Sequence, residues 1–105
     1  MSSSNLSAVT KDASNVAIAG RTRVAGIYYT CGDAASSFTL HNGGDDQAAA
    51  LLTVKTPAAI GATDIILPDM GILFDSGVYI DFEDAEVESV TLFFYGGASV
   101  PDPAP

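Results

Sequence analysis

Residues 78–95 read VYIDFEDAEVESVTLFFY, and this stretch decides the fold class. Val78, Ile80 and Phe82 occupy alternate positions, and Val, Leu and Phe repeat the alternation at positions 90, 92 and 94. Successive side chains of a β-strand point to opposite faces of a sheet, so this period of two predicts two strands, each with one buried face. Asp84 and Ala85, within an acidic segment, predict the turn between them.

The same alternation extends toward the N-terminus. Strands are predicted at residues 14–19, 22–31, 37–42, 48–55, 64–68 and 71–74, which makes about eight with the two above. Gly20 and Arg21 predict a tight connection between the first two, and the run GGDD at residues 43–46 predicts a hairpin turn. Within residues 22–31, one face is predicted to carry Arg23, Ala25, Ile27, Tyr29 and Cys31.

One segment has the composition of a helix. Residues 48–55 read AAALLTVK, and Ala and Leu favour helices. However, the run is short, it ends in Thr-Val-Lys-Thr, and Pro57 favours an extended exit. We therefore predict a strand here as well.

About eight short strands joined by Gly, Pro and Asp turns predict an all-β, antiparallel sandwich. A jelly roll is the first choice and an immunoglobulin-like sandwich the second. The 105 residues suffice for one domain, which we expect at residues 15–97. Residues 1–14 are expected to form a flexible N-terminal arm, and residues 98–105, ASVPDPAP, a Pro-rich C-terminal tail.

Charge is unevenly distributed along the chain, whose net charge is −9. Residues 1–60 balance four basic against four acidic side chains, whereas residues 61–105 carry nine carboxylates and no Lys or Arg. Such a chain is repelled by the phosphates of nucleic acid and of anionic membranes, so we expect neither as a partner. No apolar run approaches the roughly 20 residues of a membrane helix. The N-terminal residues do not show the basic region followed by a long apolar core that is typical of a secretory signal, so synthesis in the cytoplasm is expected.

Few residues are candidates for chemistry. Cys31 is the only cysteine, which excludes an intrachain disulfide and predicts a small core side chain. His41 is the only histidine, and it is expected to be an exposed strand residue before a glycine turn, with no nucleophile motif beside it. We therefore expect no enzyme activity, no catalytic residues, no cofactor and no metal.

The acidic run at residues 81–88 leaves two interpretations open. Its members are Asp81, Glu83, Asp84, Glu86 and Glu88. Carboxylates that converge on a loop can hold a calcium ion, whereas carboxylates that diverge form a solvated rim. The rim is the favoured interpretation.

Large apolar side chains, most of them aromatic, fill both faces of two predicted strands, in the runs IYY at residues 27–29 and LFFY at residues 92–95. A small sandwich normally buries one face of each sheet and exposes the other to water. Either loops and the arm cover the second face, or a partner does. The partner interpretation predicts an interface that contains Tyr28, Phe93 and Tyr95.

Three stretches of the chain carry a resemblance to a known family. They are GIYYTCGDAASSFTLHNGG at residues 26–44, LLTVKTPAAIGATDIILPDMGILFDSGVYIDF at residues 51–82 and VTLFFYGG at residues 90–97. Through these stretches the chain resembles small structural proteins of tailed-phage virions. It implies a protein of capsid decoration or cement type, made in the host cytoplasm and located on the capsid surface. The implied partners are the major capsid protein and other copies of the chain, with a trimer favoured.

A second function stays open. A receptor-recognition or carbohydrate-binding module of a phage tail or spike would use exposed Tyr28, Tyr79 and Tyr95 to stack on sugars. This alternative differs from the first in its partner, which is a glycan instead of a protein shell.

Overall fold

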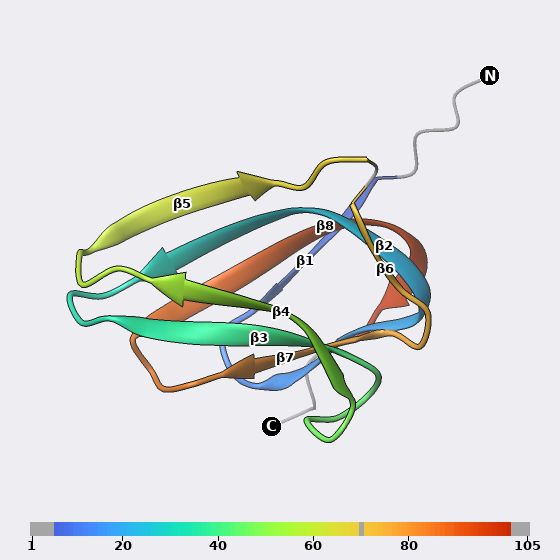
Figure 1. Cartoon of the computed structure of the whole chain (residues 1–105), viewed down its shortest axis with the longest axis horizontal. Coiled ribbons are helices and arrows are strands. Elements are labelled where there is room, and N and C mark those ends of the chain that lie inside the picture. The colour runs from blue at the N-terminus through green and yellow to red at the C-terminus, as the bar shows by residue number, and fades with distance from the viewer. Residues whose placement is uncertain (1–5, 70, 102–105) are drawn as a thin grey trace.

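The computed structural model describes residues 6–69 and 71–101, which form eight antiparallel strands (Figure 1). The strands are β1 (Ser7–Lys11), β2 (Asn15–Cys31), β3 (Ser36–Asn42), β4 (Ala49–Thr56), β5 (Gly61–Ile66), β6 (Ile72–Phe74), β7 (Val78–Phe82) and β8 (Val87–Ser99). The predicted all-β class is confirmed, and so is the strand at residues 48–55. Within the described residues, no helix has the length and apolarity needed to cross a membrane.

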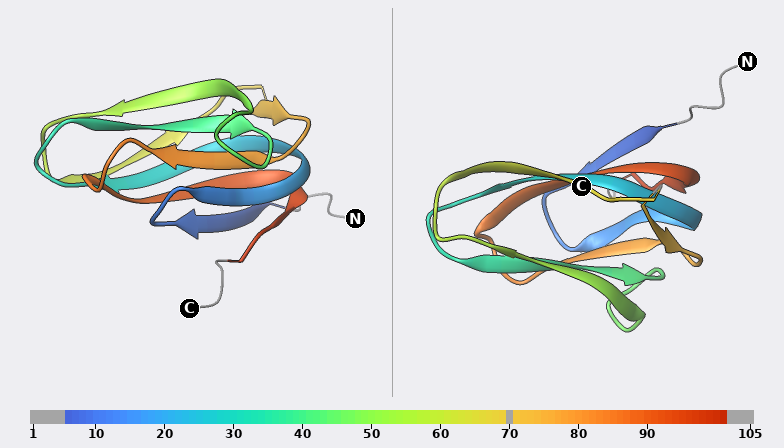
Figure 2. Two further views of the ribbon diagram at one scale, coloured as in Figure 1. Left: turned by 90° about the horizontal axis from the view of Figure 1, so that it is seen from below. Right: turned by 45° about the horizontal axis from the view of Figure 1, so that its top comes forward.

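The two layers of the sandwich meet on β2, the longest strand. Its first part pairs with β7, and β7 leads through β3 to the edge strand β4. Its second part lies between β8 on one side and β5 and β6 on the other, and β8 also pairs with β1. We name β1, β8, residues 22–31, β5 and β6 the first sheet, and residues 15–19, β7, β3 and β4 the second sheet. Figure 2 shows them as two layers.

This pairing is that of a jelly roll. The comparison requires that the two parts of β2 are counted as the second and third strands, and β5 with β6 as the sixth, so that β7 and β8 are the seventh and eighth. The first sheet then contains the first, eighth, third and sixth strands in that order. The second sheet then contains the second, seventh, fourth and fifth. Both sheets therefore interleave strands from the two halves of the chain, as two Greek keys require.

The predicted tight connection at Gly20 and Arg21 is wrong. The chain does not reverse there but continues as one strand, which bends from the second sheet into the first. Gly20 has a φ of +89°, a conformation that residues with a Cβ rarely adopt, and the register against β8 shifts between Ala19 and Thr22. A glycine that reads as a turn in the sequence is here the bend of a continuous strand.

The core lies between the two sheets and contains the apolar side chains that alternate inward. Three phenylalanines, Phe38, Phe74 and Phe94, are among its largest fully buried members, and Phe38 meets the ring of Tyr29 edge-on at 5.6 Å between centroids. Cys31 is buried as predicted. The alternation predicted for residues 90–95 is confirmed, because Val90, Leu92 and Phe94 point inward.

The single face predicted for residues 23–31 is wrong in its first half. Val24 pairs with Phe94 but Gly26 pairs with Phe93, so β2 carries one extra residue at this point. An extra residue reverses the side-chain alternation. As a result Thr22 and Val24 point inward before the bulge and Ile27, Tyr29 and Cys31 after it, whereas Arg23 lies on the outer face.

The sheets extend beyond the expected limits of the domain. Residues 7–11, in the segment expected to be an arm, form β1 against β8, and β8 continues to Ser99. Lys11, only 3% exposed, donates a hydrogen bond from Nζ to the carbonyl of Val100 at 2.6 Å, and the Val100 amide donates to the carbonyl of Ala17. Residues 1–5 and 102–105 of the expected arm and tail lie outside the described residues.

Candidate interaction surface

The outer face of the first sheet carries an apolar row across four strands. The register places Ala8 of β1, Phe93 of β8, Gly26 of β2 and Ile66 of β5 side by side. Ile66 is 85% exposed. An antiparallel sheet normally presents polar side chains on its outer face, so an apolar row here indicates a surface that a partner can cover.

The ring of Phe93 packs over Gly26, its neighbour on β2. A Cβ placed on Gly26 would lie 3.4 Å from Cδ2 of Phe93, so the ring lies over the space that the missing side chain leaves. An aromatic ring across from a glycine compensates for the weak packing of that glycine in a sheet. The ring is therefore half-buried in the isolated chain and still offers an outer edge.

Tyr28 belongs to the next row along the same face. It lies between Thr91 of β8 and Asp64 of β5 and is 40% exposed. On the far side of Thr91 is Thr10, whose hydroxyl is 2.7 Å from that of Thr91. The row thus combines one exposed aromatic ring with hydroxyl and carboxylate groups.

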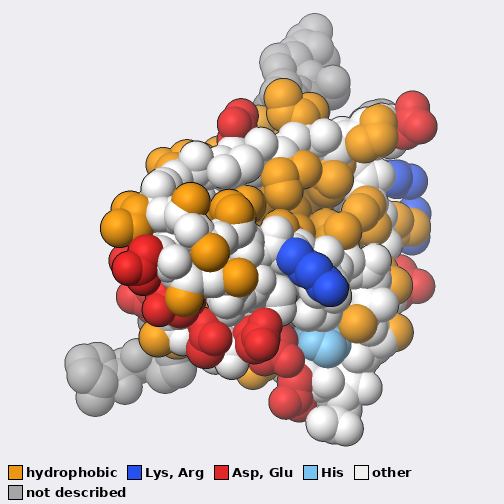
Figure 3. Space-filling model, turned by 60° about the vertical axis from the view of Figure 1, so that its left-hand side comes forward, with side chains coloured by type: hydrophobic (Ala, Val, Ile, Leu, Met, Phe, Trp, Pro, Cys, Tyr) orange, Lys and Arg blue, Asp and Glu red, His pale blue; other side chains and the backbone are white. Residues whose placement is uncertain are grey.

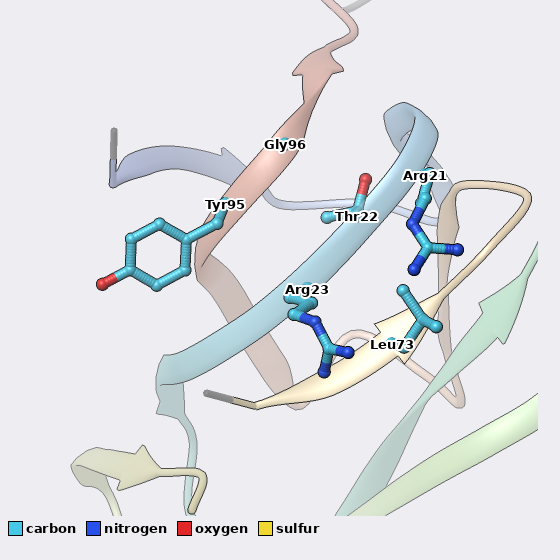
Figure 4. Close-up of a pocket in the computed structure, with 6 residues that line it drawn as sticks. All are labelled: Arg21, Thr22, Arg23, Leu73, Tyr95 and Gly96. Atoms are coloured by element: carbon cyan, nitrogen blue, oxygen red, sulfur yellow. The ribbon is translucent and has the colours of Figure 1, made fainter. Parts of the chain in front are cut away.

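A shallow hollow of about 260 Å³ lies at the end of this face (Figure 4). Tyr95 of β8, Arg23 of β2 and Leu73 of β6 form its row, and Arg21 lies beside them. Figure 4 shows both guanidinium groups extending from β2 toward β6. Neither forms an ion pair within 4 Å among the described residues.

The structure brings Tyr28, Phe93 and Tyr95 onto one face of two neighbouring strands. That they form an interface stays a prediction. Sequence reasoning did not select Ile66, Arg21 or Arg23. The arginines had a usable signal, since positions 21 and 23 share a strand face and carry two of the four basic residues of the chain.

The carboxylates of the acidic run are tied to different neighbours. Glu83 accepts a hydrogen bond from Ser37 and Asp84 one from Ser36, both at 2.7 Å, while the hydroxyl of Ser14 lies 3.4 Å from Asp81. No group of three or more metal-ligating side chains occurs within residues 6–69 and 71–101. Figure 3 shows carboxylates gathered along the lower part of one side of the molecule, and hydrophobic side chains above them.

Asp84 gives this end of the molecule a pH-dependent contact. The Ser36 hydroxyl and then the Glu86 amide lower the pKa of Asp84 below 3.8 through hydrogen bonds to its carboxylate. A lowered folded-state pKa stabilises the fold above the unfolded-state pKa, and the stabilisation disappears as the pH falls through the folded-state value.

We expect Ser36→Ala to lower the melting temperature at pH 7 and to move the pKa of Asp84 back toward 3.8. The difference from the wild type is expected to narrow in strong acid, at a pH below the folded-state pKa of Asp84, because the carboxylate is then protonated in both proteins. Thermal unfolding at the two pH values and an NMR titration of the Asp84 carboxyl measure both effects. A difference that is the same at both pH values would contradict this assignment.

His41 is buried, and the expectation that it is exposed is wrong. It is 8% exposed on the outer face of the second sheet, where its ring meets Tyr79 edge-on. Nδ1 lies 2.9 Å from the carbonyl of Ala48, and Nε2 lies 3.6 Å from Oδ2 of Asp81. The loop that joins β3 to β4 reaches back over this side of the ring through Ala48, which sequence alternation cannot show.

Tyr79 lies on the second sheet and therefore faces away from Tyr28 and Tyr95. Burial raises the pKa of its hydroxyl, and the carboxylates of Asp46, Asp81 and Asp45 raise the pKa further. The three tyrosines considered as a sugar-stacking set consequently do not form one platform. Tyr28 and Tyr95 share a face, about 13 Å apart along β8 by strand geometry.

Comparisons with models of known families, with curated proteins and with solved structures found no match. The function is therefore inferred from the surface itself.

Proposed function

We propose that the chain is a virion structural protein that decorates or cements a phage capsid through protein–protein contacts. The observation that carries the proposal is the apolar row on the outer face of the first sheet, from Ala8 through Phe93 and Gly26 to Ile66. Phe93, Tyr28 and Tyr95 flank or join it, and aromatic residues are favoured at the centres of interfaces. The proposed partners are the major capsid protein and other copies of the chain.

Two further features support a role as a surface component. Jelly rolls occur in viral capsid proteins, although they also occur in lectin domains and cupins, so the fold supports the proposal by analogy alone. The net charge of −9 suits the outside of a shell, away from packaged DNA. Repeated contacts on a shell also let individually modest interfaces add up to firm attachment.

The experiment is cryo-electron microscopy of particles from the phage whose genome encodes the chain, combined with a binding assay on particles that lack it. We expect density for the jelly roll on the capsid exterior and saturable binding of the purified protein. Particles that contain no copy of the chain would overturn the proposal, and a position in the neck or tail would overturn the capsid assignment.

Phe93→Ala is expected to weaken binding to the particle by about tenfold or more, because truncating an interface aromatic removes a major part of the contact. The matched control is Leu51→Ala on β4 of the second sheet, which removes an exposed apolar side chain from a different face. Co-sedimentation with particles measures both. Equal affinities for the two variants would place the contact elsewhere on the molecule.

The alternative, a glycan-binding module of a tail or spike, is favoured by one observation. Tyr28 combines an exposed ring with the nearby hydroxyl of Thr91 and carboxylate of Asp64, as sugar recognition requires. A glycan array distinguishes the two functions. Binding that Tyr28→Ala abolishes would favour the alternative.

A further inference from the structure

The first sheet has opposite charges at its two ends. Arg23 pairs with Tyr95 near one end of β8, and Cys31 pairs with Val87 at the other end. Eight residues of strand separate the two positions, which is about 26 Å. Arg21 and Arg23 lie at the first of these ends, and the acidic loops lie at the second.

The basic end is exceptional in a chain with four Lys and Arg residues. Lys11 is buried, and its ammonium group contacts the Val100 carbonyl, while Lys55 lies on the second sheet opposite Ser37. Arg21 and Arg23 are therefore the basic side chains of the first sheet's outer face. Arg21 contributes to the lowered pKa of Asp75, but the main causes are the hydrogen bonds that this carboxylate accepts from Asn42 and Ser76.

The acidic end is built from two loops that a backbone hydrogen bond joins. The Gly32 amide donates to the carbonyl of Glu86 at 2.8 Å, which brings the loop after β2 beside the loop before β8. Glu83 and Asp84 of this end accept hydrogen bonds from serine hydroxyls. Asp33 and Glu88 are exposed, and neither side chain forms a hydrogen bond or ion pair in the part of the chain that the structure describes.

The hollow at the basic end suits a carboxylate. An arginine presents a planar fork that binds both oxygens of a carboxylate, and two arginines in alternate positions of one strand present two such forks. Leu73 lies beside the two guanidinium groups in the same hollow (Figure 4), and its apolar surface limits the water that weakens an ion pair. Within one molecule the acidic loops lie about 26 Å from this hollow, whereas the screening length in physiological salt is about 8 Å. Their carboxylates therefore do not neutralise the two arginines of the same molecule.

We propose that the acidic end of one copy, through Asp33 and Glu88, docks onto the Arg21–Arg23 hollow of a second copy. The contact joins two different surfaces, so it is head to tail, and its repetition produces a closed ring or a filament. The inference goes beyond the proposed function because it assigns the residues of a contact between copies, which that proposal leaves open, and the purified protein alone tests it.

The test is charge reversal at each end and at both. Arg21→Glu with Arg23→Glu lowers the net charge by four, and Asp33→Lys with Glu88→Lys raises it by four, so the quadruple variant keeps the wild-type value of −9. We expect each double variant to self-associate at least about tenfold more weakly, because like charges then face each other. The quadruple variant and an equimolar mixture of the two double variants are expected to recover association, since opposite charges meet again.

Sedimentation velocity and light scattering over a range of concentrations measure these effects, and circular dichroism checks that each variant is folded. The control variant, Asp45→Lys with Asp46→Lys, raises the net charge by the same four units in the loop between β3 and β4, and its association is expected not to weaken. A wild-type protein that stays monomeric, or a quadruple variant and a mixture that both stay dissociated, would overturn the inference. Association by this contact in a protein absent from virions would leave the inference standing and overturn the proposed function.

Discussion

Replacing Phe94 by Ala is expected to lower the free energy of unfolding by about 3–5 kcal/mol. Phe94 is 1% exposed and points between the two sheets from β8, the strand that lies between β1 and β2 and pairs with both. Truncation removes the transfer free energy of the ring and leaves a cavity that a close-packed core fills only in part. A domain of this size is stable by about 5–15 kcal/mol, so the loss is a large fraction of the total. Urea unfolding followed by circular dichroism measures it.

The adjacent residue provides a matched control, because Phe93→Ala is the same chemical change one position away on the opposite face. Phe93 is half-buried over Gly26, so we expect a loss of about 1 kcal/mol from its smaller buried area. Phe93→Ala is therefore a folded variant that suits the binding experiment. Equal destabilisation by the two changes would mean that both faces of β8 are buried and would remove the basis for an exposed interaction surface.

The pattern of β8 and β3 was predictable because each strand keeps one inward face. Val90, Leu92 and Phe94 alternate without interruption, and so do Phe38 and Leu40. A strand that packs one face on the core must repeat every two residues, so its sequence reports which side chains point inward. The all-β class followed from the same rule, whereas the count of eight agrees because β2 was predicted as two strands and β1 was not predicted.

The course of β2 was not predictable from this rule. The extra residue near Ala25 reverses the alternation, and Gly20 bends the strand where its sequence reads as a turn. Both features depend on pairing with β8, which is distant in the sequence. β1 was missed for a related reason, since SAVTK has few apolar residues and its pairing with β8 makes it a strand.

The candidate surface was predicted in part. Tyr95 and Phe93 share a face of β8 by simple alternation, and Tyr28 joins them through the register of β2. Ile66 and Leu73 enter the same surface from β5 and β6, and no local pattern indicates which strand these two segments pair with. The acidic and basic ends of the first sheet likewise become visible only when the strand order is known.

Replacing Gly77 by Ala is expected to destabilise the protein by about 3 kcal/mol, near the upper limit for a residue held in a rarely populated backbone conformation. Gly77 has a φ of +107° immediately before β7, and an added Cβ would lie 2.7 Å from the carbonyl oxygen of Ile18. Real Cβ atoms do not approach a carbonyl oxygen that closely. In the variant, β2 and β7 must therefore move apart where Ile18 pairs with Val78.

The control for this prediction is Gly44→Ala. Gly44 lies in the loop between β3 and β4, its φ is not positive, and an added Cβ meets nothing within 4 Å. An alanine that fits the native conformation restricts the unfolded chain, so we expect Gly44→Ala to be neutral or to stabilise the protein by up to about 1 kcal/mol. Urea unfolding of both variants isolates the contact with Ile18 from the general effect of adding a methyl group. If the two variants were equally stable, the crossing of β2 from one sheet to the other would not depend on the close approach of β7, and the bend at Gly20 alone would account for it.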